Sequence, residues 1–113
     1  MKQINFKEDL QYREGDNPAA KMLLETDFTK EIRIVFREGQ FMKEHKAGFP
    51  IVIEIVEGAI DFGVNGENAV LNQHDIITLA ANVPHDLKAL KDSIVRLTLS
   101  KLDTVDRVQK VVE

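Results

Sequence analysis

Three histidines, His45, His74 and His85, are the residues of this sequence best suited to chemistry. An imidazole exchanges a proton near neutral pH, forms hydrogen bonds through both ring nitrogens and is a common metal ligand. Cysteine is absent, which excludes thiolate metal ligands, a cysteine nucleophile and disulfide bonds. Any site must therefore be built from nitrogen and oxygen groups.

The local contexts of the three histidines differ. If its segment is extended, His85 shares a face with Leu87 and Ala89, so its side chain is expected to point inward. His45 follows a turn glycine and is expected at a strand end, facing either the mouth of the fold or solvent. His74 lies in a Gln-His-Asp corner, where a turn role is the simplest interpretation. His85, and then His45, are therefore the candidate site residues.

The elements that position these histidines are expected to be β-strands. Apolar and polar residues alternate over 32–36, 60–64 and 94–99, which is the period of a half-buried strand. Asn65-Gly66 supplies the positive-φ pair that a two-residue hairpin turn requires. Short strands separated by turn residues predict an all-β sandwich or barrel rather than a parallel α/β sheet.

The two ends of the chain give weaker patterns. A turn at 16–18 precedes an expected strand over 21–26, and the first twelve residues are assigned to an edge strand. Near the C-terminus, Asp103 suits a helix cap, and the valines behind it fall at helical spacing: Val105, Val108, Val111 and Val112. Because valine also suits a strand, both interpretations stay open, and a short helix is favoured.

Length and composition limit the possible classes of protein. A chain of 113 residues fits a single domain over 1–113, with its core barrel at about 32–99. The net charge of -4, with lysines interspersed among carboxylates, argues against a nucleic-acid partner. The N-terminus lacks the apolar core of a secretion signal, and no apolar run approaches membrane-spanning length. We therefore expect no membrane partner and a cytoplasmic location.

The spacing of glycines and histidines over 32–99 resembles that of the cupin superfamily. The first cupin motif has the form G-x5-H-x-H-x(3,4)-E-x6-G, and Gly39, His45 and Gly58 fall at its spacing. The second has the form G-x5-P-x-G-x2-H-x3-N, and His85 takes its histidine position. The resemblance implies an antiparallel double-stranded β-helix, or jelly-roll barrel, of the RmlC-like type.

Other positions of the two motifs carry different residues. The second histidine and the glutamate of the first motif are replaced by Ala47 and Ile51. The two glycines of the second motif are replaced by His74 and Asn82, which tolerate the left-handed backbone region, so the turns are expected to persist. The proline and the asparagine of the second motif are replaced by Ala80 and Ala89. The loss of polar groups at the motif positions predicts a more apolar pocket than in metal-dependent cupins.

In metal-dependent cupins, the resemblance implies a divalent ion held by three histidines and a glutamate. Only His45 and His85 are carried over, so the expected cofactor is either a divalent transition metal, completed by water or a ligand, or none. Glu44 and Gln40 are the nearby candidates for a third ligand. Glu44 adjoins His45, however, and should face the opposite side of its strand.

Two function classes follow, and a third possibility stays open beside them. In a binding or sensing module, His45 and His85 would fix the polar end of a small-molecule ligand in an apolar barrel. In a metal-dependent enzyme, such as a dioxygenase or isomerase, the same histidines would hold the ion. A metal-free isomerase would use one of them as general base. The lost metal ligands favour the binding module, whose pocket would be lined by Phe41, Ile51, Ile53 and Leu87.

The run 51–56 is hydrophobic on both faces, unlike a strand with one side in water. Small cupins resembling this chain commonly pair through their sheets, so we expect a homodimer that covers Val52 and Val56. The alternative is that the N-terminal segment or the C-terminal valines of the same chain cover this face.

Overall fold

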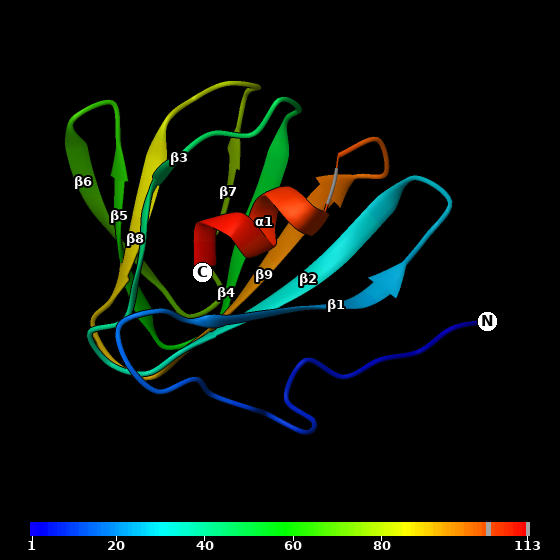
Figure 1. The fold of residues 1–113 in the computed structure, drawn as a ribbon, viewed down its shortest axis with the longest axis horizontal. Coiled ribbons are helices and arrows are strands. Elements are labelled where there is room, and N and C mark those ends of the chain that lie inside the picture. Colours follow the sequence, from blue (N-terminus) through cyan, green and yellow to red (C-terminus); the bar gives the residue numbers. More distant parts are fainter. Residues whose placement is uncertain (104, 113) are drawn as a thin grey trace.

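The computed structural model describes residues 1–103 and 105–112. Two antiparallel sheets face each other across an apolar interior, and a short helix lies at one side (Figure 1). No helix among the described residues is long and apolar enough to cross a membrane. In this part of the chain the elements are β1 (Ala19–Glu25), β2 (Thr29–Phe36), β3 (Phe41–His45), β4 (Ile51–Glu57), β5 (Ala59–Val64), β6 (Glu67–Asn72), β7 (Ile76–Leu79), β8 (His85–Ala89), β9 (Ser93–Ser100) and α1 (Val105–Val112).

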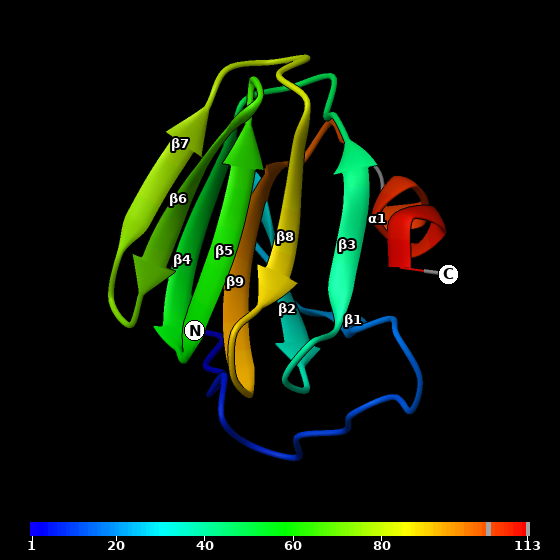
Figure 2. The same ribbon diagram turned by 90° about the vertical axis from the view of Figure 1, so that its left-hand side faces the viewer.

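The strands alternate between two sheets in a way that confirms the predicted antiparallel all-β class. One sheet has the order β1-β2-β9-β4-β7 and the other the order β3-β8-β5-β6. In Figure 2 the two sheets stand one behind the other, with α1 beside β3. The end strands are therefore β1 and β7 in one sheet and β3 and β6 in the other.

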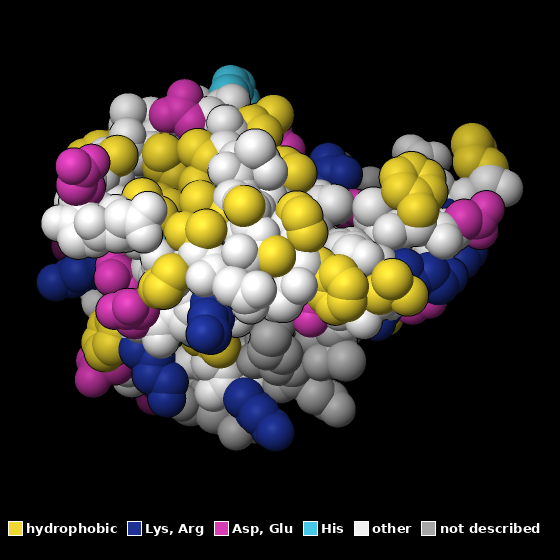
Figure 3. All heavy atoms as spheres, turned by 90° about the horizontal axis from the view of Figure 1, so that it is seen from above, with side chains coloured by type: hydrophobic (Ala, Val, Ile, Leu, Met, Phe, Trp, Pro, Cys, Tyr) yellow, Lys and Arg dark blue, Asp and Glu magenta, His cyan; other side chains and the backbone are white. Residues whose placement is uncertain are grey.

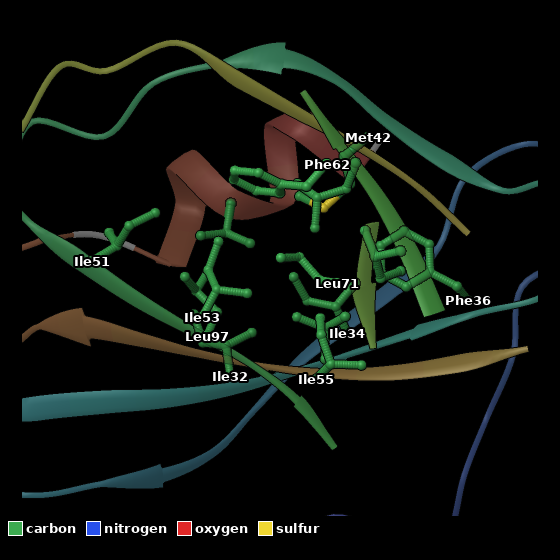
Figure 4. Packing of buried hydrophobic residues seen from close by; sticks show 14 of the residues in the cluster. Ile32, Ile34, Phe36, Met42, Ile51, Ile53, Ile55, Phe62, Leu71 and Leu97 are labelled. Atoms are coloured by element: carbon green, nitrogen blue, oxygen red, sulfur yellow. The ribbon is translucent and has the colours of Figure 1, made fainter. Parts of the chain in front are cut away.

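The alternation in the sequence selects the core. Ile32, Ile34 and Phe36 of β2 lie with Ile51, Ile53 and Ile55 of β4 on the inner face of the five-stranded sheet, where β9 separates the two strands. The other sheet contributes Met42, Phe62 and Leu87 to the same buried cluster, part of which Figure 4 shows. Inward positions recur every second residue because successive strand side chains point to opposite faces.

The C-terminal helix is also confirmed. Val108 and Val112 are each 1% exposed and belong to the core cluster, and Val111 packs against it. The side chain of Val105 lies outside the described part of the chain. Helical spacing thus places one stripe of valines on the core.

The turn residues have the backbone that the sequence predicts. Asn65 and Gly66 have φ values of 52° and 77° between the paired strands β5 and β6. His74 and Asn82, which replace motif glycines, have φ values of 77° and 65°. The left-handed turns therefore persist without glycine, as expected.

The edge strand predicted for the first twelve residues is wrong. Residues 1–18, here called the N-terminal strap, contain no strand and run along the outer face of the five-stranded sheet. The guanidinium of Arg33, which is 4% exposed, donates hydrogen bonds to the carbonyl oxygens of Glu8 at 2.6 Å and Asp9 at 3.3 Å. Buried side chains, rather than a neighbouring strand, therefore satisfy part of the strap's backbone.

The strap covers part of the outer face whose covering the sequence left open. The ring of Phe6 lies 5.7 Å from the guanidinium of Arg96, and Lys7 forms an ion pair with Glu57 at 2.9 Å. On the outer face of β4, Val52 is still 38% exposed. Coverage by the same chain is thus partial.

Candidate functional site

His45 and His85 meet at the end of the barrel where β3 stops and β8 starts. The two residues are paired in the antiparallel register, and their ring centroids are 4.3 Å apart with the planes at 60°. Both rings line one cavity between the sheets. The structure thus brings together the two histidines that the sequence selected. His74 lies at the exposed corner before β7.

A β-bulge in β3 directs His45 inward. Met42 pairs with Leu87 and His45 pairs with His85. Between these two pairs, β3 therefore has one more residue than β8. Without the extra residue, the alternation from the buried Met42 would turn Glu44 inward and His45 outward. With it, Glu44 is exposed, in agreement with the prediction that it faces away from His45.

Backbone carbonyl groups orient both imidazoles. The Nδ1 atom of His45 lies 2.7 Å from the carbonyl oxygen of Lys43, and that of His85 lies 2.9 Å from the carbonyl oxygen of Val83. In a neutral ring, Nδ1–H donates to the carbonyl oxygen, which leaves the lone pair on Nε2. The ring of Phe62 stacks on His85, with centroids 5.8 Å apart and planes at 21°. His85 is therefore fixed on two sides and is only 3% exposed.

The rest of the cavity is apolar and narrow. The space open to the centre of a water molecule is about 10 Å³, which is about the size that admits one water. Figure 3 shows hydrophobic side chains gathered over this end of the molecule. Besides the two histidines, the cavity is lined by Ile34, Met42, Ile51, Ile53, Leu87, Val95, Leu97 and Val108.

The inward position predicted for Phe41 is wrong. Ile51, Ile53 and Leu87 line the cavity as predicted, whereas the side chain of Phe41 is 42% exposed and Met42 takes the inward place. Counting back from His45 by twos gives Phe41, but the bulge in β3 reverses that parity. The contribution of Val108 was also missed, since nothing in the sequence indicates where the C-terminal helix docks.

The residues that replace the cupin metal ligands leave the histidines with little support for an ion. Ala47 and Ile51 are 3% and 4% exposed and carry no polar side-chain atom. Gln40, a candidate third ligand, instead donates from its amide to the carbonyl oxygens of Arg13 and Gly15 in the strap. No group of three or more histidine, aspartate or glutamate side chains among the described residues is placed to hold a metal. The four-ligand set of metal-dependent cupins therefore does not fit this cavity.

Comparisons with known proteins show which solved structures have a similar fold. No family model matches the chain, and no curated protein matches its sequence. Among solved structures, an RmlC-like cupin from Desulfovibrio desulfuricans superposes with a TM-score of 0.80 at 20% identity, covering 88% of this chain and 96% of that one. A protein with a double-stranded β-helix domain from Klebsiella pneumoniae gives 0.79 at 16%, covering 92% and 94%. An RmlC-like cupin from Shewanella frigidimarina gives 0.73 at 23%, covering 88% and 91%.

Proposed function

Since the chain has the fold of the RmlC-like cupins, we propose that it binds a small molecule between its two sheets, with His45 and His85 holding the ligand's polar end. One observation supports this proposal above others. Two imidazole rings, with centroids 4.3 Å apart, lie in a cavity whose other lining side chains are apolar. Ligand sites typically combine such an apolar wall with a few converging polar groups.

The histidine pair suits a polar head group on an apolar body. A neutral ring in this orientation accepts a hydrogen bond at Nε2, and a protonated ring donates one from the same atom. Imidazoles can therefore pair with a hydroxyl, an amide or a carboxylate head group. Ile51, Ile53 and Leu87 would contact the apolar body of the ligand.

A metal-dependent enzyme, such as a dioxygenase or isomerase, is the second candidate. Anchoring of Nδ1 by a carbonyl oxygen is the arrangement that metal-bound histidines commonly show, and it favours this candidate. Two protein ligands fall short of the three that catalytic sites usually supply, however. A metal-free isomerase with one histidine as general base would need the same ligand contact as the binding module.

Binding of small apolar carboxylates tests the proposal. We expect benzoate to shift the imidazole resonances of His45 and His85 in nitrogen-edited NMR spectra. The resonances of His74 should stay unchanged. His85→Ala is expected to weaken benzoate binding at least about ten-fold, because the head group loses a hydrogen bond at a buried site. His74→Ala, which changes an exposed turn histidine, is the matched control and should bind as the wild type does.

Two results would overturn this proposal. One is a shift of none of the histidine signals by benzoate, hexanoate or phenol, which sample different head groups. The other is a stoichiometric transition metal in protein purified without chelator or a metal-binding tag, lost in His85→Ala. That second result would establish the metal-dependent candidate instead.

The homodimer expected from the sequence stays a prediction, and we propose that it forms on the outer face of β4. Val52→Lys is expected to convert a dimer to a monomer in size-exclusion chromatography with light scattering, because the new charge would lie in an apolar contact. Val70→Lys is the matched control, since Val70 is 54% exposed on β6 of the other sheet. A monomeric wild type, or a Val52→Lys variant that still pairs, would contradict this arrangement.

A further inference from the structure

Helix α1 closes one side of the barrel. β1 and β3 are the end strands of the two sheets, and α1 packs against both of them (Figures 1 and 2). Val108 and Val112 are each 1% exposed within the core cluster. The helix therefore supplies the apolar wall that the gap between the two sheet ends would otherwise lack.

The same helix fills the space that a ligand would need. Val108 lines the cavity that contains His45 and His85, and only about 10 Å³ remains open to the centre of a water molecule. A cavity of about 150 Å³ is the scale at which a protein interior accepts a ligand as small as benzene. With α1 in place, the cavity thus holds little more than one water, so the proposed ligand requires part of the wall to move, and Val108 is the part that α1 contributes.

Two hydrogen bonds tie the described part of α1 to β1 and to the strap. Gln109 donates from Nε2 to the carbonyl oxygen of Ala20 in β1 at 2.9 Å. Arg13, in the strap, donates from Nη1 to the carbonyl oxygen of Val112. A cation is favourable there because the last carbonyl groups of a helix lack partners within the helix.

Arg13 is itself held by a buried residue. Its carbonyl oxygen accepts a hydrogen bond from Nε2 of Gln40 at 2.7 Å, and Gln40 is 3% exposed. The strap thus links the turn before β3 to the end of α1. An eight-residue helix is too short to be stable alone in water, so α1 depends on these contacts and on its buried valines.

From these contacts we infer that α1 is a displaceable lid over the histidine cavity, and that Arg13 latches it. The ligand's entry by displacement of the lid rests on the proposed function. The latch itself does not, because it follows from the contacts of Val108, Val112 and Arg13.

The absence of cysteine allows a direct test of the lid. A thiol introduced as Val108→Cys reports opening of α1, and one introduced as Ile55→Cys, at a position in β4 that is 0% exposed and is not part of the cavity lining, reports unfolding of the barrel. Each variant is mixed in its native state with an excess of a chromogenic disulfide reagent. We expect the Val108→Cys thiol to react at least about ten-fold faster than the Ile55→Cys thiol, since local opening requires less free energy than global unfolding.

The latch is tested by adding Arg13→Ala to both variants. Loss of one charge-assisted hydrogen bond should raise the reaction rate of the Val108→Cys thiol roughly five- to ten-fold and leave that of the Ile55→Cys thiol unchanged. Equal rates at the two positions would overturn the lid. A Val108→Cys rate that does not respond to Arg13→Ala would overturn the latch.

Benzoate separates this inference from the proposed function. If benzoate shifts the histidine signals and speeds the reaction of the Val108→Cys thiol, the ligand enters by displacing α1. If it shifts the signals and slows that reaction, α1 stays closed over the ligand and displacement is wrong. If it shifts no signal, the proposed function fails for this probe, while the dependence on Arg13 still decides the latch.

Discussion

Replacing Gly58 by alanine is expected to lower the free energy of unfolding by roughly 3 to 5 kcal/mol, a large share of the stability of a small domain. Gly58 joins β4 to β5, where the chain passes from one sheet to the other. Its φ is 97°, a backbone conformation that residues other than glycine rarely adopt. A Cβ atom there would also lie 2.1 Å from Oγ of Ser93 and 2.7 Å from its Cα.

The Ser93 contact makes the collision hard to relieve. The hydroxyl of Ser93 is buried and accepts a hydrogen bond from the backbone N–H of Ala59 at 3.1 Å. A shift of Ser93 would therefore break a bond at the point where the two sheets meet. Urea unfolding at neutral pH measures the effect, since the change in midpoint reports the loss of stability.

Two other glycines separate backbone strain from collision. Gly39 has a φ of 87° but nothing within 4 Å of a built Cβ, so Gly39→Ala should cost only about 1 kcal/mol for the strained backbone. Gly48 has neither the strained φ nor a close neighbour, so Gly48→Ala should be close to neutral. A Gly58→Ala variant no less stable than Gly39→Ala would show that the connection adapts to the methyl group.

The sheets were predictable because their signals are local. Alternation over 32–36, 60–64 and 94–99 reports which face of a strand is buried, and β2, β5 and β9 occupy those segments. Asn65 and Gly66 form the hairpin turn because both residue types readily adopt the positive φ that the turn requires. His74 could be assigned to a left-handed turn for the same kind of reason.

The sequence-based predictions failed where the position of a residue depends on partners far away in the sequence. The bulge in β3 is defined by its pairing with β8, so the exposure of Phe41 and the inward place of Met42 could not be predicted from the sequence. The path of the strap could not be predicted because several of its carbonyl groups bond to the distant side chains of Arg33 and Gln40, and such contacts leave no period in the strap itself. Val108 completes the cavity through tertiary docking alone.

Acidification is expected to remove most of the stability that the carboxylate of Glu31 contributes. Glu31 is 3% exposed on the outer face of β2, where it accepts hydrogen bonds from Nε of Arg96 at 2.9 Å and from the hydroxyl of Thr98. Because hydrogen bonds to a charged group are worth more than neutral ones, Glu31→Gln should cost about 2 kcal/mol near neutral pH.

The direction of the pH dependence follows from the pKa of Glu31. Burial alone would raise that pKa, but hydrogen bonds from Thr98 and Thr29 oppose the effect of burial. The hydrogen bond and positive charge of Arg96 act in the same direction, so the pKa in the folded protein lies below its ordinary value of 4.5. The carboxylate's contribution is therefore fully present above pH 4.5 and is lost as the pH falls through the lower, folded-state pKa.

Unfolding of the wild type and Glu31→Gln in urea, compared over a pH series, measures this dependence. The difference between the two should be constant from neutral pH down to the ordinary carboxyl pKa and should shrink below it. Glu54→Gln is the matched control, because Oε1 of Glu54 lies 3.8 Å from Nη1 of the same Arg96. This longer ion pair, on an arginine side chain that is 43% exposed, should contribute less than about 1 kcal/mol. Equal losses in the two variants would assign the effect to the charge of Arg96 alone, whereas a larger loss in Glu31→Gln assigns it to the buried hydrogen bonds.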